Sequence, residues 1–306
     1  MKYIKNNKLS IFVYLFLLLL IFASFYKYFK DYYSYAPYYY DLEEKCESGN
    51  KKSCIEFEKK YKYVMDPREK FKQVDTITLA SEIIETSYFS ILQWIAPLII
   101  IILVVDSFHR ELSSGIFKYY LNRMTYKKYL KRLFFISLKV SWVLPVCLLL
   151  VFLISGLLTG FNFSITDYAI SSPFYYSFKY NNFIIYEIVI CILIFLMSLL
   201  YGNLTVICSK KNKNGLITIV ISYIAFLMVD LFIYVVFYAL ILNQIIGITN
   251  MTDYFNITGY WFFDNDMNYI LLILIALLIT FTSYVAVYFS YRSKEKLIYE
   301  NEKQNS

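Results

Sequence analysis

The chain has 306 residues, of which 59% are hydrophobic and only 17% are charged. Soluble globular domains carry about 25% charged residues, and here the hydrophobic residues fall in long blocks rather than in short periodic stripes. The composition therefore excludes an ordinary soluble domain. The formal net charge is +7, and its distribution along the chain is more informative than its sum.

Six hydrophobic blocks are long enough to cross a membrane. A helix needs about 20 predominantly apolar residues to span the hydrocarbon core. We therefore predict an all-α membrane protein with six transmembrane helices, organised as one transmembrane domain over residues 1–306. The predicted spans are 9–26, 87–105, 133–159, 183–207, 215–242 and 269–290.

Basic residues alternate between the connections and predict the orientation of the spans. Cytoplasmic loops of membrane proteins are enriched in Lys and Arg. The basic segments are residues 1–8, 106–132, 208–214 and the tail after residue 290, whereas 160–182 and 243–268 carry a single Lys between them. Both termini are therefore predicted to be cytoplasmic, which agrees with an even number of spans.

The first external loop, residues 27–86, is long and carries acidic and basic residues in nearly equal measure. This pattern favours a small solvated helical cap over a substrate gate. Cys46 and Cys54 lie in this loop, where an external position permits a disulfide and leaves free thiols as the alternative. A metal site is not expected, because no His or further Cys lies nearby.

Three ionisable residues fall inside the predicted spans. Lys139 and Glu187 lie near the ends of their helices and can reach water, but Asp230 lies near the middle of the fifth span. An intramembrane carboxylate is costly and marks a functional candidate. A hydrogen bond to a neighbouring Ser or Tyr and a substrate or proton site both stay open for Asp230. Pro97 and Pro145 interrupt the second and third spans and can kink them.

The motifs of common enzymes are missing from the sequence. It contains no phosphate-binding loop of the Gly-x-x-x-x-Gly-Lys-Ser/Thr type and no His-Glu-x-x-His zinc motif. The only His is His109, at the membrane edge of a basic connection, where a surface role is expected. The chain is therefore predicted not to be an enzyme, and no cofactor is expected in it.

The connection at 106–132 is the most informative segment. We predict an amphipathic helix at the membrane surface, then a break near Asn122 and Met124, and then a second helix that leads directly into the third span. An ordinary basic loop held by lipid headgroups is the alternative. Gly115 is expected to allow a close backbone approach and Thr125 to cap the second helix. The helical stripe consists of Leu112, Ile116, Tyr119 and Tyr120.

This segment resembles the corresponding region of the permease subunits of ABC transporters of the type-2 exporter superfamily. Glu111 and Gly115 match the Glu and Gly that follow the second span in that family, and Arg123, Thr125 and the stretch from Tyr126 to Lys131 match the later part. The Pro that the family often places before the basic residue is missing. The six-span layout, the cytoplasmic ends and the long first external loop are also similar.

The resemblance implies a membrane subunit of an ATP-driven exporter in a bacterial plasma membrane, paired with a second permease and with a separate ATPase subunit that holds ATP and Mg. Its cargo would be an amphipathic or hydrophobic peptide, lipid or drug, with antimicrobial peptide resistance as one role. Membrane lipids, but no nucleic acid, are the other expected partners. The residues expected to couple to the ATPase are Arg110, Glu111, Gly115, Lys118 and Arg123.

Two functions from other classes stay open. The chain could be a membrane sensor or assembly scaffold that acts through the external loop at 27–86. It could also be an ion-coupled secondary transporter that works through Asp230, although such transporters usually place several charges or broken helices near the midplane.

Overall fold

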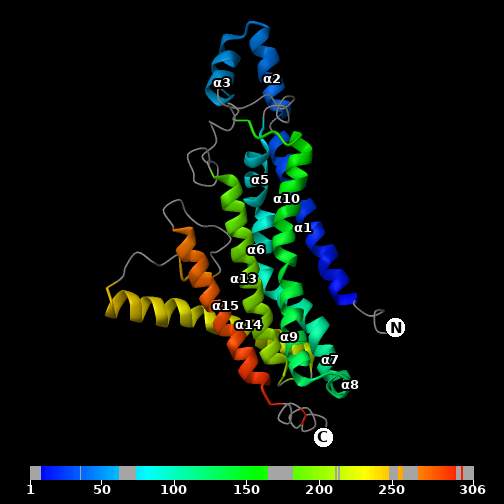
Figure 1. Ribbon diagram of the computed structural model, residues 1–306. Coiled ribbons are helices and arrows are strands. Elements are labelled where there is room, and N and C mark those ends of the chain that lie inside the picture. Colours follow the sequence, from blue (N-terminus) through cyan, green and yellow to red (C-terminus); the bar gives the residue numbers. More distant parts are fainter. Residues whose placement is uncertain are drawn as a thin grey trace. The chain divides into compact units, whose positions relative to one another are not determined.

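A computed structural model of the chain describes residues 8–34, 36–61, 74–164, 182–210, 212, 214–247, 254–257, 268–293 and 298, apart from the side chains of residues 32, 110 and 113. The described residues form helices and contain no strand (Figure 1). Six helical stretches are long and apolar enough to cross a membrane. The prediction of an all-α, six-span membrane protein is therefore confirmed.

The spans begin and end close to the predicted residues. The first span contains α1 (Lys8–Tyr33), the second α6 (Ser87–Val104), the third α9 (Tyr126–Ser141) and α10 (Val143–Thr159), the fourth α13 (Phe183–Ser209), the fifth α14 (Gly215–Leu231) and the π-helix η3 (Phe232–Ile245), and the sixth α15 (Tyr269–Tyr291). The remaining helices are α2 (Ala36–Glu47), α3 (Lys51–Tyr61), α5 (Thr76–Ile84), the π-helix η2 (Val105–His109), α7 (Arg110–Ser113) and α8 (Ile116–Arg123).

Asn side chains set the first residues of two spans. The first backbone N–H groups of a helix have no partner within the helix and need an external acceptor. The side chain of Asn214 accepts a hydrogen bond from the N–H of Leu216 at 2.9 Å. The side chain of Asn268 accepts from Ile270 and Leu271 at 3.1 and 3.2 Å. These caps explain why α14 and α15 begin where the hydrophobic blocks begin.

The third span is divided into two helices where the sequence predicted an interruption. α9 ends at Ser141, and α10 begins two residues later. The ring of a Pro clashes with the carbonyl four residues earlier, and the residue four before Pro145 is Ser141. The division therefore follows from Pro145, whereas α6 continues through Pro97.

The chain divides into two compact units, and the first contains Met1–Phe16, Gln93–Val146 and Glu187–Ser306. The helix ends that the basic segments flank come together within this unit. The Lys210 ammonium donates to the carbonyl of Ser290 at 2.8 Å, and the Tyr126 hydroxyl donates to the carbonyl of Tyr291. The end of α13, the start of α9 and the end of α15 therefore meet at one place, as the predicted orientation requires.

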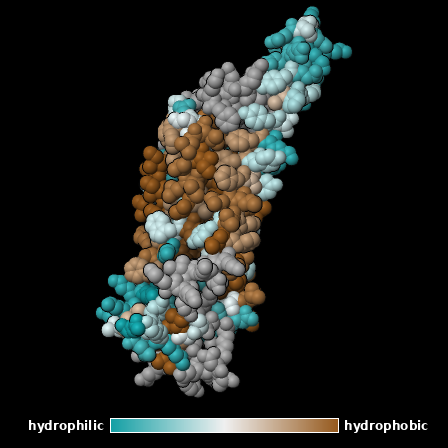
Figure 2. All heavy atoms as spheres, turned by 90° about the vertical axis from the view of Figure 1, so that its right-hand side faces the viewer, coloured by the Kyte–Doolittle hydropathy of each residue, from teal (hydrophilic) through white to brown (hydrophobic). Residues whose placement is uncertain are grey.

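The fifth span leaves most of its apolar surface uncovered. Only 17% of its most hydrophobic window is buried, and α14 with η3 runs at a wide angle to α13 and α15 in Figure 1. Figure 2 displays a different face, on which hydrophobic side chains also predominate along the spanning helices. Contact of such side chains with water is unfavourable, so lipid or another apolar surface must cover them.

The second unit contains Leu17–Leu92 and Cys147–Tyr186, and it includes a buried short helix that the sequence did not predict. Residues 27–86 were expected to form a solvated cap, but most side chains of α5 are buried. Asp75 caps α5 by accepting from the N–H and the hydroxyl of Thr78 at 2.9 and 2.7 Å. The N–H of Thr76 donates to the carbonyl of Asn162 at 2.8 Å. This network holds the start of α5 next to the chain after α10.

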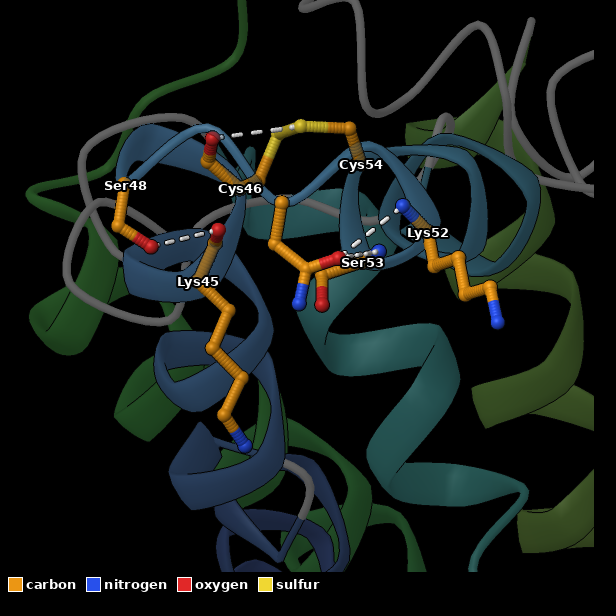
Figure 3. The surroundings of a disulfide bond; sticks show 7 residues. Lys45, Cys46, Ser48, Lys52, Ser53 and Cys54 are labelled. Atoms are coloured by element: carbon orange, nitrogen blue, oxygen red, sulfur yellow. Dashed lines mark hydrogen bonds between the residues drawn. A yellow bond between two sulfur atoms is a disulfide. The ribbon is translucent and has the colours of Figure 1, made fainter.

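A helical hairpin of α2 and α3 forms the solvated part of the same loop. A disulfide joins Cys46 to Cys54 across the turn, and Gly49 takes a left-handed conformation with a φ of 88°. The side chain of Asn50 accepts from the N–H of Lys52 at 3.2 Å (Figure 3). A small hydrophobic cluster between the helices comprises Tyr39, Leu42 and Tyr61 with Tyr40 and Phe57. The disulfide is therefore present in the structure.

Candidate functional site

The candidate site is the segment from η2 through α8 (residues 105–123). We call it the coupling segment, after the role that the resemblance implies. Figure 1 shows α7 and α8 beside the start of α9. The chain turns between α7 and α8 at Gly115, whose φ of 72° lies in the left-handed region that side chains disfavour. A Cβ added to Gly115 would meet nothing within 4 Å. Within this chain, Gly115 is therefore suited to the turn by its conformation, and no other backbone in the described part of the chain approaches it closely.

The π-helix η2 ties the coupling segment to the first span. The Asp106 carboxylate accepts from both the N–H and the hydroxyl of Ser10, at 3.3 and 2.5 Å. Ser10 is the third described residue of α1. The Asp106 carboxylate therefore joins η2 to the N-terminal part of the first span as the structure describes it.

The same π-helix contacts the fifth and sixth spans. α14 packs against η2, and a Cβ on Gly215 would lie 3.5 Å from both His109 and Val105. The rings of Phe108 and Tyr291 meet edge to face with centroids 6.1 Å apart. His109 is buried, so the predicted surface position is wrong: η2 extends the second span by one turn and takes His109 into the bundle.

Glu111 points into the protein. Its side chain is only 7% exposed and accepts a hydrogen bond from the Nη2 of Arg132 at 2.9 Å. Burial raises the pKa of Glu111 above its usual value, and the charge and the hydrogen bond of Arg132 oppose this rise. Glu111 thus faces α9 rather than a surface that a partner could reach.

Arg132 was not among the predicted site residues, yet it holds the coupling segment to the third span. Its guanidinium lies 3.9 Å from the centroid of the Tyr120 ring, so Arg132 contacts α7 through Glu111 and α8 through Tyr120. Residues 127–132 contain four basic side chains, and nothing in that pattern distinguishes the one that turns inward. Arg132 is the side chain that turns inward, because it pairs with the buried carboxylate of Glu111.

α8 buries a different stripe from the predicted one. Phe117 and Leu121 are its buried residues, whereas the Tyr119 side chain is 50% exposed. The guanidinium of Arg123 lies 4.1 Å from the centroid of the Tyr119 ring. Leu112 is buried, as the predicted stripe requires, and Lys118 is half-buried. The exposed side of α8 therefore presents a Tyr with an Arg on its ring.

Two further predicted positions complete the segment. Thr125 occupies the N-cap position of α9, but its side chain makes no capping hydrogen bond. The Arg110 side chain lies outside the described part of the structure. Lys127, Lys128 and Lys131 on α9 are exposed and extend the basic surface beside Arg123.

Asp230 lies at the end of α14, one residue before the last of that helix. Its carboxylate accepts a hydrogen bond from the backbone of Ile257, whereas the sequence suggested a neighbouring Ser or Tyr. Phe255, two residues before Ile257, packs its ring on Phe237 and Tyr238 of η3. The carboxylate therefore holds backbone from the loop after the fifth span, and it also interacts electrostatically with the buried Tyr201 of α13.

The described residues offer little to a cofactor or metal. No group of three or more His, Cys, Asp or Glu side chains that could hold a metal ion occurs among them. A small apolar cavity in the first unit is at the lower limit for one water molecule, and its lining consists of Met197, Leu200, Ile257, Ala276, Ile279 and Thr280. Neither feature matches a nucleotide site.

Comparisons with known proteins add no further constraint. No protein-family model matches the sequence, and neither a curated protein nor a solved structure matches the chain. The chain is a multi-pass membrane protein by its six apolar helices. Its function must be inferred from the coupling segment and from the resemblance that the residues from Glu111 to Lys131 carry.

Proposed function

We propose that this chain is the membrane subunit of an ATP-driven exporter, powered by a separate ATPase subunit. One observation carries the proposal: the coupling segment contacts four other elements of the bundle. Asp106 binds α1, Glu111 binds α9, and η2 packs against α14 and, through Phe108, against α15. A force applied to this one short segment would therefore reach four spans.

The exposed side of α8 is the proposed binding surface for the ATPase. It offers Tyr119, Arg123 and the neighbouring Lys127 and Lys128, and aromatic and Arg side chains are enriched at protein interfaces. Glu111 acts on the inner side of the same segment. In this proposal the outer side of the coupling segment binds the ATPase, and its inner side contacts the spans.

The proposed cargo is an amphipathic or hydrophobic molecule such as a peptide, a lipid or a drug. The resemblance implies that the path for cargo is shared with a second copy or a homologous permease. The uncovered apolar surface of α14 and η3 supports such pairing. Lipid is the alternative cover for this surface.

Copurification tests the proposal. The tagged chain is extracted gently from its native membrane, and the bound proteins and ATP hydrolysis are measured for the wild type and for Arg123→Glu. The control is Lys51→Glu, an equal charge reversal on exposed α3. We expect an ATPase subunit to copurify with the wild type and with Lys51→Glu, and to be lost from Arg123→Glu.

Either of two results would overturn this function. If no ATPase copurifies with the wild type, the chain is not an exporter subunit of this kind. If exchange of the α2–α3 hairpin abolishes signalling while Arg123→Glu has no effect, the sensor or scaffold function replaces it. Transport that persists without ATP and stops in Asp230→Asn would favour the ion-coupled alternative.

A further inference from the structure

The ion pair between Glu111 and Arg132 spans the joint between the coupling segment and the third span. Glu111 lies in α7 and Arg132 in α9, 21 residues further along the chain. The two helices are otherwise separated by α8 and by the extended residue Met124. Backbone continuity alone would leave this connection flexible, so its stiffness depends on side-chain contacts.

Breaking the ion pair between Glu111 and Arg132 is energetically costly because of its position. Glu111 is buried, and removal of one partner of a buried ion pair leaves the other charge without compensation. The second carboxylate oxygen of Glu111 and the Nε of Arg132 are buried and make no hydrogen bond among the described residues. The hydrogen bond from Arg132 therefore compensates only one of the two carboxylate oxygens, and removing it would leave the carboxylate without a charged partner.

Tyr120 adds a second constraint on the same guanidinium. A planar guanidinium can donate hydrogen bonds in its plane while its face lies on an aromatic ring. Arg132 donates to Glu111, and its guanidinium lies 3.9 Å from the centroid of the Tyr120 ring and also hydrogen-bonds the Tyr120 side chain. Arg132 therefore contacts α7 and α8 at the same time. A Lys in this position could keep the charge but would lose the planar contact.

We propose that Arg132 is the positioning residue of the coupling segment, which fixes α7 and α8 against α9 so that a displacement of α8 moves the third span. This inference rests on the proposed function for the source of that displacement. The fixed geometry itself is a property of this chain alone. It can therefore be measured without the ATPase.

The geometric test uses the full chain in lipid nanodiscs. Spin labels are attached at two exposed positions, Tyr119→Cys on α8 and Leu138→Cys on α9. The free cysteines Cys147, Cys191 and Cys208 are replaced by Ala, and the Cys46–Cys54 disulfide is retained. We expect a narrow distribution of distances between the two labels when Glu111 and Arg132 are both present, and a broad distribution in Arg132→Ala. The control Lys131→Ala removes an exposed neighbouring charge and should stay narrow.

Two further variants separate positioning from general damage. The exchange Glu111→Arg with Arg132→Glu restores the pair without the Tyr120 contact, so it should narrow the distribution again in part. Glu111→Gln with Arg132→Ala removes both charges but restores no contact between α7 and α9, so its distribution should stay broad.

The coupling test uses the copurified complex. Arg132→Ala should retain the ATPase, because the exposed side of α8 is intact, but should lose the stimulation of hydrolysis by the membrane subunit about tenfold, which corresponds to about 1.4 kcal/mol. A narrow distribution in Arg132→Ala would overturn the inference whether or not an ATPase is found. A broad distribution with unchanged hydrolysis would also overturn it, whereas the absence of any ATPase from the wild type would overturn the proposed function instead.

Discussion

Single residues decide how the coupling segment turns and where it points. Gly115 provides a left-handed turn, Asp106 hydrogen-bonds Ser10 of another helix, and Glu111 turns away from solvent toward Arg132. The resemblance implies that Glu111 and Gly115 take part in coupling to an ATPase. The structure shows what each residue does within the chain: Gly115 takes a left-handed conformation, and Glu111 pairs with Arg132.

Replacing Gly115 tests the conformational reason. Gly115→Ala should destabilise the turn by about 1–2 kcal/mol, the cost of a left-handed conformation for a residue with a Cβ. Gly115→Asn should cost less, because Asn populates this region more readily. Thermal unfolding and limited proteolysis near Ser114 would report the change.

The matched control is Gly215→Ala. Gly215 has no positive φ, and its added Cβ would make ordinary contacts with His109 and Val105, so the melting temperature should change little. If Ala and Asn at position 115 were equally harmful, conformation would not be the reason for Gly there.

The site could be predicted from the sequence only in part. Helical spacing located the coupling segment, the break near Met124 and the start of the next helix. It could not select Arg132 from the basic run at 127–132, and it placed His109 at the surface. Both errors have one cause: α7 and η2 are buried by other spans, and local periodicity carries no information about distant segments.

At the scale of elements, packing between spans depends on small residues. Gly202 on α13 faces Ser137 on α9, and a Cβ on Gly202 would lie 3.2 Å from the Ser137 Cβ and 3.3 Å from its hydroxyl. Small residues let membrane helices approach closely, which increases their van der Waals contact. This contact joins the third span to the fourth within the first unit.

Enlarging Gly202 should separate these two helices. Gly202→Ala should lower the thermal stability of the protein in detergent, because overpacking typically costs about 1–3 kcal/mol. Ser137→Gly removes both of the nearest atoms, so the double variant should recover part of the loss. Scanning fluorimetry of the single and double variants would show whether the two changes in thermal stability are independent. Purely additive changes in stability would contradict a direct contact.

At the scale of the whole molecule, the six spans could be predicted from hydrophobic length alone. A stretch of about 20 apolar residues has few alternatives to a spanning helix, since each backbone group must find its partner within the segment. The buried helix α5 could not be predicted in this way. Its sequence, Thr76–Ile84, is short and partly polar, and its burial depends on neighbours far along the chain.

Sidedness is a prediction for the intact membrane. Lys51 and Lys127 are exposed side chains that the charge pattern assigns to opposite faces. In intact cells a membrane-impermeant maleimide should label Lys51→Cys, whereas Lys127→Cys should react only after permeabilisation. Labelling of both from outside, or of Lys127→Cys alone, would contradict the orientation. The unchanged chain gives the background from its three free thiols.

The disulfide of the hairpin also has a consequence for biosynthesis. Cys46 and Cys54 lie between the first two spans, and an oxidising compartment lets such a bond form and persist. With the predicted orientation, the bond can therefore close only after the hairpin has crossed the membrane. In a pulse-chase experiment, its appearance would date the translocation of the first external loop and would reveal whether the first span inserts while the later ones are still being synthesised.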